Sequence, residues 1–215
     1  PRAVSIGDYV GTVQIGADED VTCTITNTRK GHIVVDKVTV PGGSDQSFPF
    51  EISGTGYQNF SLTDSDPVDD QALAPGSYSV SEDLAGLPWD LTGLVCQPAA
   101  GSTSTETLGA ETAEIDLLAG DTVTCTFTNT RRALLVVQKQ TDPPQPGASD
   151  VFSFDSPVND LNVDLGHGQS SQALVEPGTY TVAETVPPSW TLDISCVGGN
   201  ISSGSGNTAT FVVEA

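Results

Sequence analysis

Apolar and polar residues alternate along most of the chain, in short runs separated by turns rich in glycine, proline and acidic residues. Alternation with a period of two is the pattern of a β-strand that buries one face. The clearest runs cover residues 32–37, 77–82, 113–117 and 123–130, and again 134–139, 179–184 and 209–213. The abundance of Thr, Ser, Val, Gly and Pro also disfavours helices. The pattern predicts an all-β protein.

These runs form a repeat, because the same features return in the same order and at similar spacing. Each copy has an apolar strand ending in lysine, a Phe-x-Phe pair, a Pro-Gly turn before a Tyr-x-Val-x-Glu strand, a tryptophan and a cysteine. They lie at residues 32–37, 48–50, 74–82, 89 and 96, and again at 134–139, 152–154, 176–184, 190 and 196. Strand periodicity at this spacing is typical of immunoglobulin-like β-sandwiches of about 100 residues. We therefore predict two tandem sandwich domains, residues 31–132 and 133–215.

The second copy lacks the strand that closes the first. In the first copy Val123–Thr130 follows a turn, whereas the second copy reaches only residues 209–215, which match the strand before that turn. A spare closing strand lies at the other end of the chain, where Val21–Thr28 copies Val123–Thr130 almost residue for residue. We predict that residues 1–30 form a separate segment carrying a donor strand. One face of that strand holds Val21, Cys23, Ile25 and Asn27.

The four cysteines can be paired by comparing their positions in the two repeats. Cys96 and Cys125 lie in one repeat and are expected to form a disulfide, which indicates an oxidising compartment outside the cytoplasm. Cys196 occupies the position of Cys96, so its partner should occupy that of Cys125, and Cys23 is the candidate. Residues 29–31 are too short a link for the donor strand to fold back to the second repeat. Either Cys23 pairs with Cys196 of a neighbouring chain, or the sequence comes from a longer array of repeats.

Polar residues also occupy the inward face of these strands. An amine, a carboxyl and an amide continue the rows of apolar positions in the first, the tyrosine-bearing and the closing strand. Burying such a group alone costs several kcal/mol, so three of them aimed inward indicate a shared purpose. The residues are Lys37, Glu82 and Asn129 around the first repeat, with Lys139, Glu184 and Asn27 at the matching positions.

The first-strand lysine, the glutamate of Pro-Gly-x-Tyr-x-Val-x-Glu and the Phe-x-Asn of the closing strand resemble the Cna-B-type or SpaA-like repeats. These are prealbumin-like domains of bacterial surface adhesins and pilins, and the resemblance covers both repeats. It implies a self-generated isopeptide bond: the lysine amine attacks the asparagine side-chain carbonyl, ammonia leaves and the glutamate shuttles protons. Burial lowers the lysine pKa and so supplies the neutral nucleophile. Carried over, the reacting sets are Lys37, Glu82 and Asn129, and then Lys139, Glu184 and Asn27 of a neighbour.

Composition narrows the choice of partners. Asp and Glu number 28 against 7 Lys and Arg, for a formal net charge of -21, which argues against nucleic acid and anionic membranes. No apolar window is long enough to span a bilayer. Two histidines and no Cys-x-x-Cys pair give no basis for a zinc or redox site, and no cofactor is expected. Asp64, Asp66, Asp69 and Asp70 are a weak calcium candidate, but a solvated acidic turn is the better interpretation.

Together these observations predict a structural protein, not an enzyme. The leading hypothesis is a subunit of an extracellular or cell-surface filament. Each copy would donate residues 18–28 to the second repeat of the next, giving a head-to-tail homopolymer locked by a Cys23–Cys196 disulfide. One alternative is a stretch of a long multi-repeat surface protein, in which the donor strand closes a preceding domain. Another is an adhesin module that binds a ligand through its loops, although neither repeat has an enlarged, aromatic-rich loop.

Overall fold

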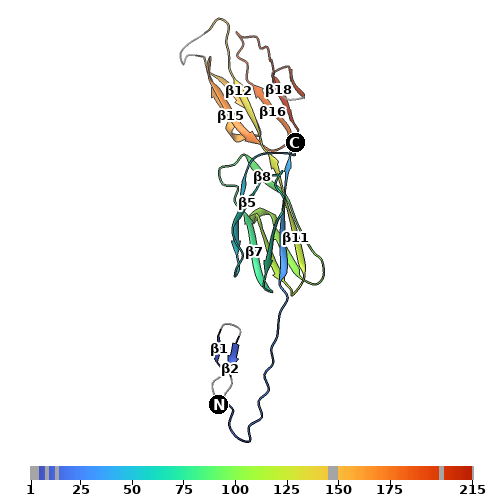
Figure 1. Cartoon of the computed structure of the whole chain (residues 1–215). Helices are drawn as coiled ribbons and strands as arrows, with labels where there is room; N and C mark the ends of the chain where they lie inside the picture. The colour runs from blue at the N-terminus through green and yellow to red at the C-terminus, as the bar shows by residue number, and fades with distance from the viewer. Residues whose placement is uncertain (1–4, 8–9, 13–14, 145–149, 199–200, 215) are drawn as a thin grey trace.

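The computed structural model describes residues 5–7, 10–12, 15–144, 150–198 and 201–214. Strands dominate, and the helical turns are the short 3-10 segments η1 (Leu108–Ala110) and η2 (Asn159–Leu161). Figure 1 shows the chain as a row: an N-terminal segment, a first sandwich (repeat 1) and a second sandwich (repeat 2). Within the described residues, no helix is long and apolar enough to cross a membrane.

Repeat 1 is a closed sandwich of two sheets, with strand orders β5-β4-β7-β10-β9 and β6-β3-β11-β8. Its strands are β3 (Gly31–Val40), β4 (Phe48–Ser53), β5 (Phe60–Leu62), β6 (Asp69–Leu73), β7 (Gly76–Glu82), β8 (Trp89–Pro98), β9 (Thr103–Thr107), β10 (Thr112–Leu117) and β11 (Thr122–Arg131). β3 and β11 pair in parallel, and the other neighbouring strands pair antiparallel. The chain therefore enters the domain on β3 and leaves it on the strand directly beside β3.

The core of repeat 1 is built from alternate residues of these strands. β3 and β11 bury every second side chain along almost their whole length. Phe50 and Phe127 meet edge to face with ring centroids 5.1 Å apart, and Trp89 packs on Phe48 at 5.5 Å. Each large side chain buried in this way contributes about 1.5–3 kcal/mol. The predicted disulfide, Cys96–Cys125, ties β8 to β11 and packs with this core.

Repeat 2 has one complete sheet and half of the other. Its five-stranded sheet has the order β14-β13-β16-β18-β17 and corresponds to the five-stranded sheet of repeat 1. As far as the structure describes it, the second sheet consists of β12 and β15, which correspond to β3 and β6. The strands are β12 (Ala133–Gln138), β13 (Phe152–Asp155), β14 (Asp164–Leu165), β15 (Ser170–Val175), β16 (Gly178–Glu184), β17 (Ile201–Ser205) and β18 (Thr208–Val213).

The places of β11 and β8 are not occupied by strands in the described part of repeat 2. Residues 190–197, which match β8, are described but form no strand. The reason is that β8 is held in repeat 1 by hydrogen bonds to β11, and the described residues of repeat 2 include no strand equivalent to β11. Trp190 still packs on Phe152, with ring centroids 5.3 Å apart, although it is only half-buried. The open edge thus leaves several core side chains, among them Tyr180, Trp190 and Phe211, only partly buried.

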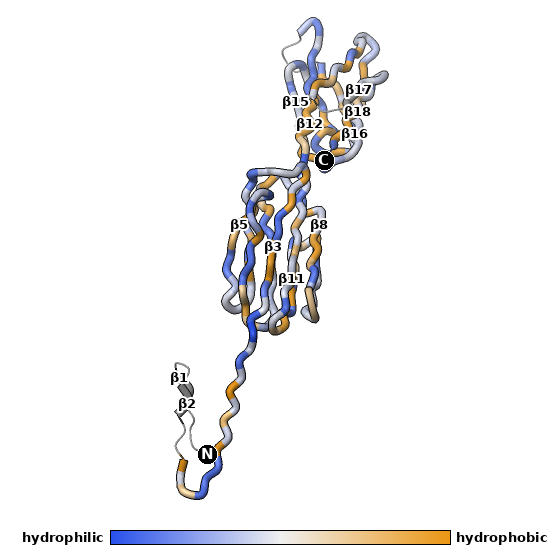
Figure 2. Tube along the Cα trace, turned by 45° about the vertical axis from the view of Figure 1, so that its right-hand side comes forward, coloured by the Kyte–Doolittle hydropathy of each residue, from blue (hydrophilic) through white to orange (hydrophobic). Residues whose placement is uncertain are grey.

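The N-terminal segment begins with a hairpin, β1 (Ser5–Gly7) and β2 (Val10–Thr12), and continues as an extended chain to repeat 1. Residues 17–30 are exposed, and Figure 2 shows hydrophobic and hydrophilic positions alternating along this stretch. The expected strand Val21–Thr28 therefore has no ladder within the described chain, because no sheet edge lies beside it. It points away from repeat 2, on the far side of repeat 1 (Figure 1).

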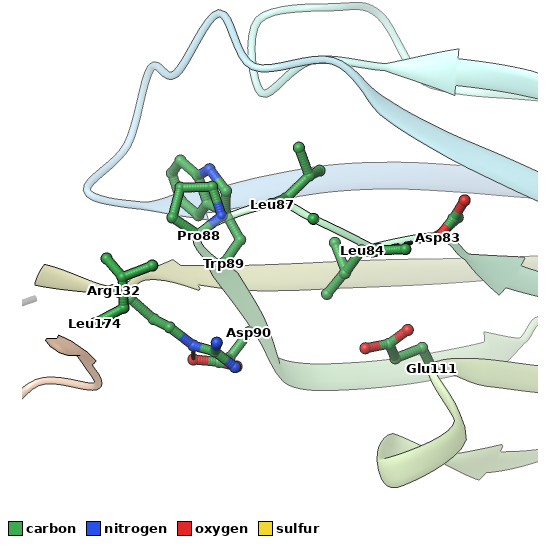
Figure 3. A pocket seen from close by; sticks show the side chains of 11 residues that line it. Asp83, Leu84, Leu87, Pro88, Trp89, Asp90, Glu111, Arg132 and Leu174 are labelled. Carbon is green, nitrogen blue, oxygen red and sulfur yellow. Dashed lines mark hydrogen bonds and ion pairs between the residues drawn. The ribbon is translucent and has the colours of Figure 1, made fainter. Parts of the chain in front are cut away.

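The two repeats are joined with a single residue between strands. Arg132 alone separates β11 from β12, and its backbone amide donates to Pro88 O at 2.9 Å. Its side chain donates from Nε to Asp90 Oδ2 at 2.7 Å and from Nη2 to Asp90 Oδ1. Figure 3 shows this pair at one end of a pocket whose lining also includes Leu174 of repeat 2. The link is therefore fixed to repeat 1.

Candidate functional site

The three polar residues predicted to act together in repeat 1 come from three strands that converge on one end of the core. Lys37 lies on β3, Asn129 on β11 and Glu82 at the end of β7 in the opposite sheet. In the parallel β3–β11 ladder, Lys37 is level with Phe127 and Asn129 is level with Thr39. Lys37 and Asn129 are therefore one step apart on the same inward face of neighbouring strands. The side chains of Lys37 and Glu82 are fully buried, and Asn129 is 0% exposed.

Glu82 links the other two side chains. Its Oε1 lies 3.4 Å from Lys37 Nζ and accepts a hydrogen bond from Asn129 Nδ2 at 2.9 Å. Lys37 Nζ also donates to the carbonyl oxygens of Val38 and Phe127, each at 3.1 Å. These contacts hold the amine, the carboxyl and the amide in one buried network.

Burial shifts both titrating groups of this network towards their neutral forms. Loss of hydration lowers the pKa of the Lys37 amine, and the nearby Glu82 carboxylate only partly opposes this effect. Loss of hydration likewise raises the pKa of Glu82 against the opposing influence of Lys37. Moving one proton from Lys37 to Glu82 yields an uncharged amine beside an uncharged carboxylic acid. The site thus favours the nucleophilic form of the lysine without exchanging a proton with solvent.

Two acceptor atoms in the network have no hydrogen-bond partner: Glu82 Oε2 and Asn129 Oδ1. An unpaired buried acceptor costs about 1–3 kcal/mol, so the unreacted cluster is a costly arrangement. Chemically it holds a nucleophile, a proton carrier and an amide carbonyl. That combination can form an amide between two side chains.

An aromatic ring completes each lysine environment, and this role was not predicted from the sequence. Lys37 Nζ lies 4.5 Å from the centroid of the Phe48 ring, and Lys139 Nζ lies 4.0 Å from that of Phe152. Both phenylalanines open the Phe-x-Phe pair that recurs in the two repeats. The recurrence was visible in the sequence, but only the sandwich brings the ring over the amine.

Repeat 2 contains the first two members of the same cluster. Lys139 Nζ donates to Glu184 Oε1 at 2.8 Å and to Oε2 at 2.9 Å, and both residues are buried. Within the described residues, no asparagine side chain from a closing strand joins them, because that strand is absent from the repeat. Lys139 and Glu184 instead form a close two-point ion pair.

The residues assigned to the donor strand lie far from this pair in the same chain. Val21, Cys23, Ile25 and Asn27 are all exposed on the N-terminal segment, beyond the opposite end of repeat 1. Cys23 and Cys196 are both free thiols. The chain therefore does not bring Cys23 to Cys196 or Asn27 to Lys139 within itself.

The weak calcium candidate is not supported. Asp64 accepts hydrogen bonds from the backbone amides of Thr39, at 2.8 Å, and Gly43, and so fixes a turn. Asp66 accepts from Thr63 N, Asp69 from Gln71, and Asp70 pairs with His32. In the part of the chain that the structure describes, no three acidic, histidine or cysteine side chains gather as a metal site. The four carboxylates serve local turns and cross-strand contacts instead.

A family model described as a prealbumin-like fold domain matches residues 33–131, which is repeat 1 from its first strand to the end of its last. The match therefore likens repeat 1 to prealbumin-like fold domains, and it covers slightly less than half of the chain. Repeat 2 shares its sheet order where its strands are present, so the chain carries two prealbumin-like sandwiches in tandem. No curated protein matches the chain.

Solved structures similar to the chain include a Bacillus anthracis protein, a streptococcal pilin and a pilus adhesin. The Bacillus anthracis TIE protein is 15% identical, with a TM-score of 0.38 over 86% of this chain and 32% of that one. A streptococcal ancillary pilin is 14% identical, with a TM-score of 0.38 over 88% and 60%. The pilus adhesin SpaC of Lactobacillus rhamnosus GG is 18% identical, with a TM-score of 0.31 over 74% and 24%. The chain spans less than two thirds of each, and at these scores the likeness does not assign a function.

Proposed function

We propose that this chain is a structural element of an extracellular filament or stalk, and that repeat 1 is locked by an isopeptide bond between Lys37 and Asn129. The observation that carries the proposal is the buried network in which Glu82 contacts both partners. An enzyme acting on an outside substrate needs an accessible site, whereas these three side chains are closed off from solvent.

The reaction balances within the three side chains. A proton passes from the Lys37 ammonium to Glu82, and the neutral amine attacks Asn129 Cγ. The new Nζ–Cγ bond forms as the Cγ–Nδ2 bond breaks. Glu82 delivers the proton that lets Nδ2 leave as ammonia and accepts the surplus proton of the attacking Nζ, so it ends as the carboxylic acid. Glu82 Oε1 is 2.9 Å from Nδ2, which is the position required for that delivery. The products are one secondary amide and one molecule of ammonia.

The position of the bond suits a load-bearing role. Because β3 is the first strand and β11 the last, a pull on the two ends of repeat 1 acts on these neighbouring strands in opposite directions. A covalent link between Lys37 and Asn129 passes the force from one strand to the other. The chain between them, including the core, is then shielded from extension. The single-residue junction at Arg132 would transmit the load to repeat 2 without slack.

Intact mass of the purified chain tests this proposal. The expected mass is lower than the sequence mass by one ammonia, in addition to the two hydrogens lost in the Cys96–Cys125 disulfide. Peptide mapping should recover a branched fragment that joins the peptides containing Lys37 and Asn129. A mass that shows the disulfide but no loss of ammonia, after prolonged incubation of folded protein, overturns the proposal.

We further propose that repeat 2 is completed by a closing strand from outside it, which a neighbouring chain supplies in a head-to-tail filament and the same protein supplies in a multi-repeat array. The open edge of β12 lies where β11 pairs with β3 in repeat 1. Transferring the repeat 1 register places Cys23 beside Cys196, as Cys125 faces Cys96, and Asn27 beside Thr141, as Asn129 is level with Thr39. In that register a neighbour's Asn27 meets the Lys139–Glu184 pair, so the isopeptide chemistry can occur between chains.

Oxidation of the concentrated chain tests the head-to-tail arrangement. The expected result is a ladder on non-reducing gels, with Cys23–Cys196 as the mapped linkage. Cys23→Ser and Cys196→Ser should each abolish the ladder, since each removes one half of the same bond. If either single variant still forms disulfide dimers, the linkage is random thiol pairing and the register is wrong.

A second arrangement has the same structural role, with the repeats following one another in one long protein. It is favoured by the similarity of the two links: Val21–Thr28 reaches β3 through residues 29–30, as Val123–Thr130 reaches β12 through residues 131–132. In this arrangement the donor strand closes a repeat that precedes repeat 1. Gels of the native material distinguish the two: a ladder indicates a polymer of chains, and one large species indicates a continuous array.

A further inference from the structure

The β1–β2 hairpin has a counterpart at the same place in each repeat. In repeat 1 the hairpin β9–β10 directly precedes the closing strand, and in repeat 2 the hairpin β17–β18 ends the described chain. Val10, the first residue of β2, pairs with Gly7, as Thr112, the first residue of β10, pairs with Thr107. Val10 and Thr112 also stand at the same distance before their closing strands. The segment therefore repeats the penultimate hairpin as well as the closing strand.

The turn between hairpin and closing strand is repeated too. Asp18 adopts a φ of 66° and Gly120, at the matching position, a φ of 72°. A positive φ is uncommon for a residue with a side chain, so its return at this site marks the same turn. The next residue is acidic in both cases, Glu19 and Asp121. The described residues between 5 and 28 thus form a hairpin, a left-handed turn and an extended stretch, in the order that β9, β10 and β11 show in repeat 1.

The same segment exposes the side chains that its counterpart buries. Ile15 is 65% exposed, Val21 49% and Ile25 87%. The matching residues of repeat 1 are Leu117, Val123 and Phe127, which are 2%, 0% and 0% exposed. A row of apolar side chains in extended backbone is stable only against a partner that covers it. Cys23, whose counterpart is in a disulfide, is also unpaired.

Repeat 2 lacks room for all of this segment. Its β18 already pairs with β16 on one side and β17 on the other, so the hairpin position is filled. Of the hairpin and the closing strand, the described part of repeat 2 lacks only the closing strand. A partner that takes β1 and β2 as well as Val21–Thr28 must lack three strands rather than one.

We infer that residues 5–28 are the last three strands of a further prealbumin-like repeat, whose body consists of strands equivalent to β3 through β8. That body presents a cysteine at the position of Cys96 to Cys23. The inference rests on the proposed stalk architecture and selects the multi-repeat arrangement for the N-terminal segment, while the isopeptide bond of repeat 1 is independent of it.

The inference is tested by mixing the full chain with two fragments of repeat 1, each of which lacks strands and can act as an acceptor for residues 5–28. Residues 31–98 lack β9, β10 and β11, whereas residues 31–118 lack β11 alone. Each is mixed with the full chain under mildly oxidising conditions, and the Cys23–Cys96 linkage is quantified by peptide mapping. The shorter acceptor should capture Cys23 at least tenfold more than the longer one, because only it has the hairpin position open.

A matched variant of the full chain replaces residues 5–12 by a Gly-Ser stretch of equal length. It should lose capture by the shorter acceptor and keep whatever capture the longer one shows. If the longer acceptor captures Cys23 equally well or better, or if the replacement has no effect, the inference is wrong.

A fusion protein keeps the inference testable even if an acceptor fragment does not fold on its own. Residues 31–98 are placed ahead of the full chain through a flexible linker, and amide hydrogen exchange is followed at residues 10–12 and 21–28. The inference is supported if both stretches are protected in the fusion and neither is protected in the unfused chain. It is overturned if the fusion protects residues 21–28 alone or protects neither stretch. The mass test of Lys37 and Asn129 is read on repeat 1 in the same samples, so failure of one proposal is distinguished from failure of the other.

Discussion

Glu82→Gln is the most informative single change, because it removes the proton carrier while keeping the size and hydrogen-bonding shape of the side chain. A glutamine cannot accept the proton of the Lys37 ammonium or deliver one to Asn129 Nδ2. We therefore expect no isopeptide bond in this variant. Lys37 would also remain buried without its charge partner, since the side chains of Lys37 and Glu82 are both fully buried in the native chain.

The loss of stability has two parts of comparable size. The proposed bond between residues 37 and 129 would close a loop of roughly 90 residues in the unfolded chain, and the loop-entropy relation used for disulfides assigns this about 4.5 kcal/mol. Removing one partner of a buried ion pair costs about 3–5 kcal/mol more. Together these approach the whole stability of a typical domain, about 5–15 kcal/mol. Repeat 1 of Glu82→Gln should be barely folded.

Lys37→Met is the matched control. It also abolishes the bond, but it replaces the amine with an unbranched apolar side chain and leaves Glu82 free to stay neutral. We expect it to lose only the loop term of about 4.5 kcal/mol, which lowers the guanidinium midpoint by about 1–2 M. The order of stability should be native, then Lys37→Met, then Glu82→Gln.

Guanidinium unfolding followed by fluorescence measures these differences. Trp89 is 4% exposed in the core of repeat 1, and a Trp190→Phe background removes the signal of repeat 2. Intact mass on the same samples records whether ammonia was lost. If Glu82→Gln loses ammonia and unfolds at the native midpoint, Glu82 is not the proton carrier and the reasoning fails.

Two further outcomes follow from the structure of repeat 1. In Lys37→Met, burial raises the pKa of Glu82 in the folded state, so the Glu82 carboxyl loses its proton at lower pH in the unfolded chain than in the folded one. The free energy of unfolding should therefore be highest below 4.5, the ordinary pKa of glutamate, and should fall as pH rises through the raised folded-state pKa. A Lys37→Met, Glu82→Gln double variant should show no such pH dependence. Gly54→Ala should destabilise repeat 1 by about 3 kcal/mol, because φ there is 126° and a Cβ would collide with the Tyr78 ring. Gly56→Ala, with φ of 81° and open space, should cost only about 1–2 kcal/mol in the same thermal unfolding assay.

The repeat structure and the inward faces could be predicted from the sequence because both depend on local order. A strand alternates its side chains with a period of two, so Lys37, Glu82 and Asn129 are assigned to the buried face as soon as their strands are recognised. Comparison of two copies in one chain then reveals that a closing strand is missing from the second. Pairing of Cys96 with Cys125 follows from the same comparison, and the structure contains that bond.

The folded arrangement decided which of those inward residues meet. Periodicity does not state that β11 lies beside β3 in parallel, which is what brings Asn129 next to Lys37 across about 90 intervening residues. It also does not place Phe48 over the Lys37 amine. For the same reason the acidic run that begins at Asp64 could be taken as a weak metal candidate, although its carboxylates bind local backbone and side-chain groups.

The extended stretches at residues 21–28 and 190–197 show most clearly what the sequence determines and what the tertiary structure decides. Each has the sequence of a strand, yet neither is one in this chain, because a strand is defined by hydrogen bonds to a neighbour that lies elsewhere in the sequence. The amino-acid sequence by itself determined which face of each segment is apolar and is therefore stable only when buried. The tertiary structure decided whether a partner edge was present, since sheet pairing joins residues that are distant along the chain and local pattern carries no information about that distance.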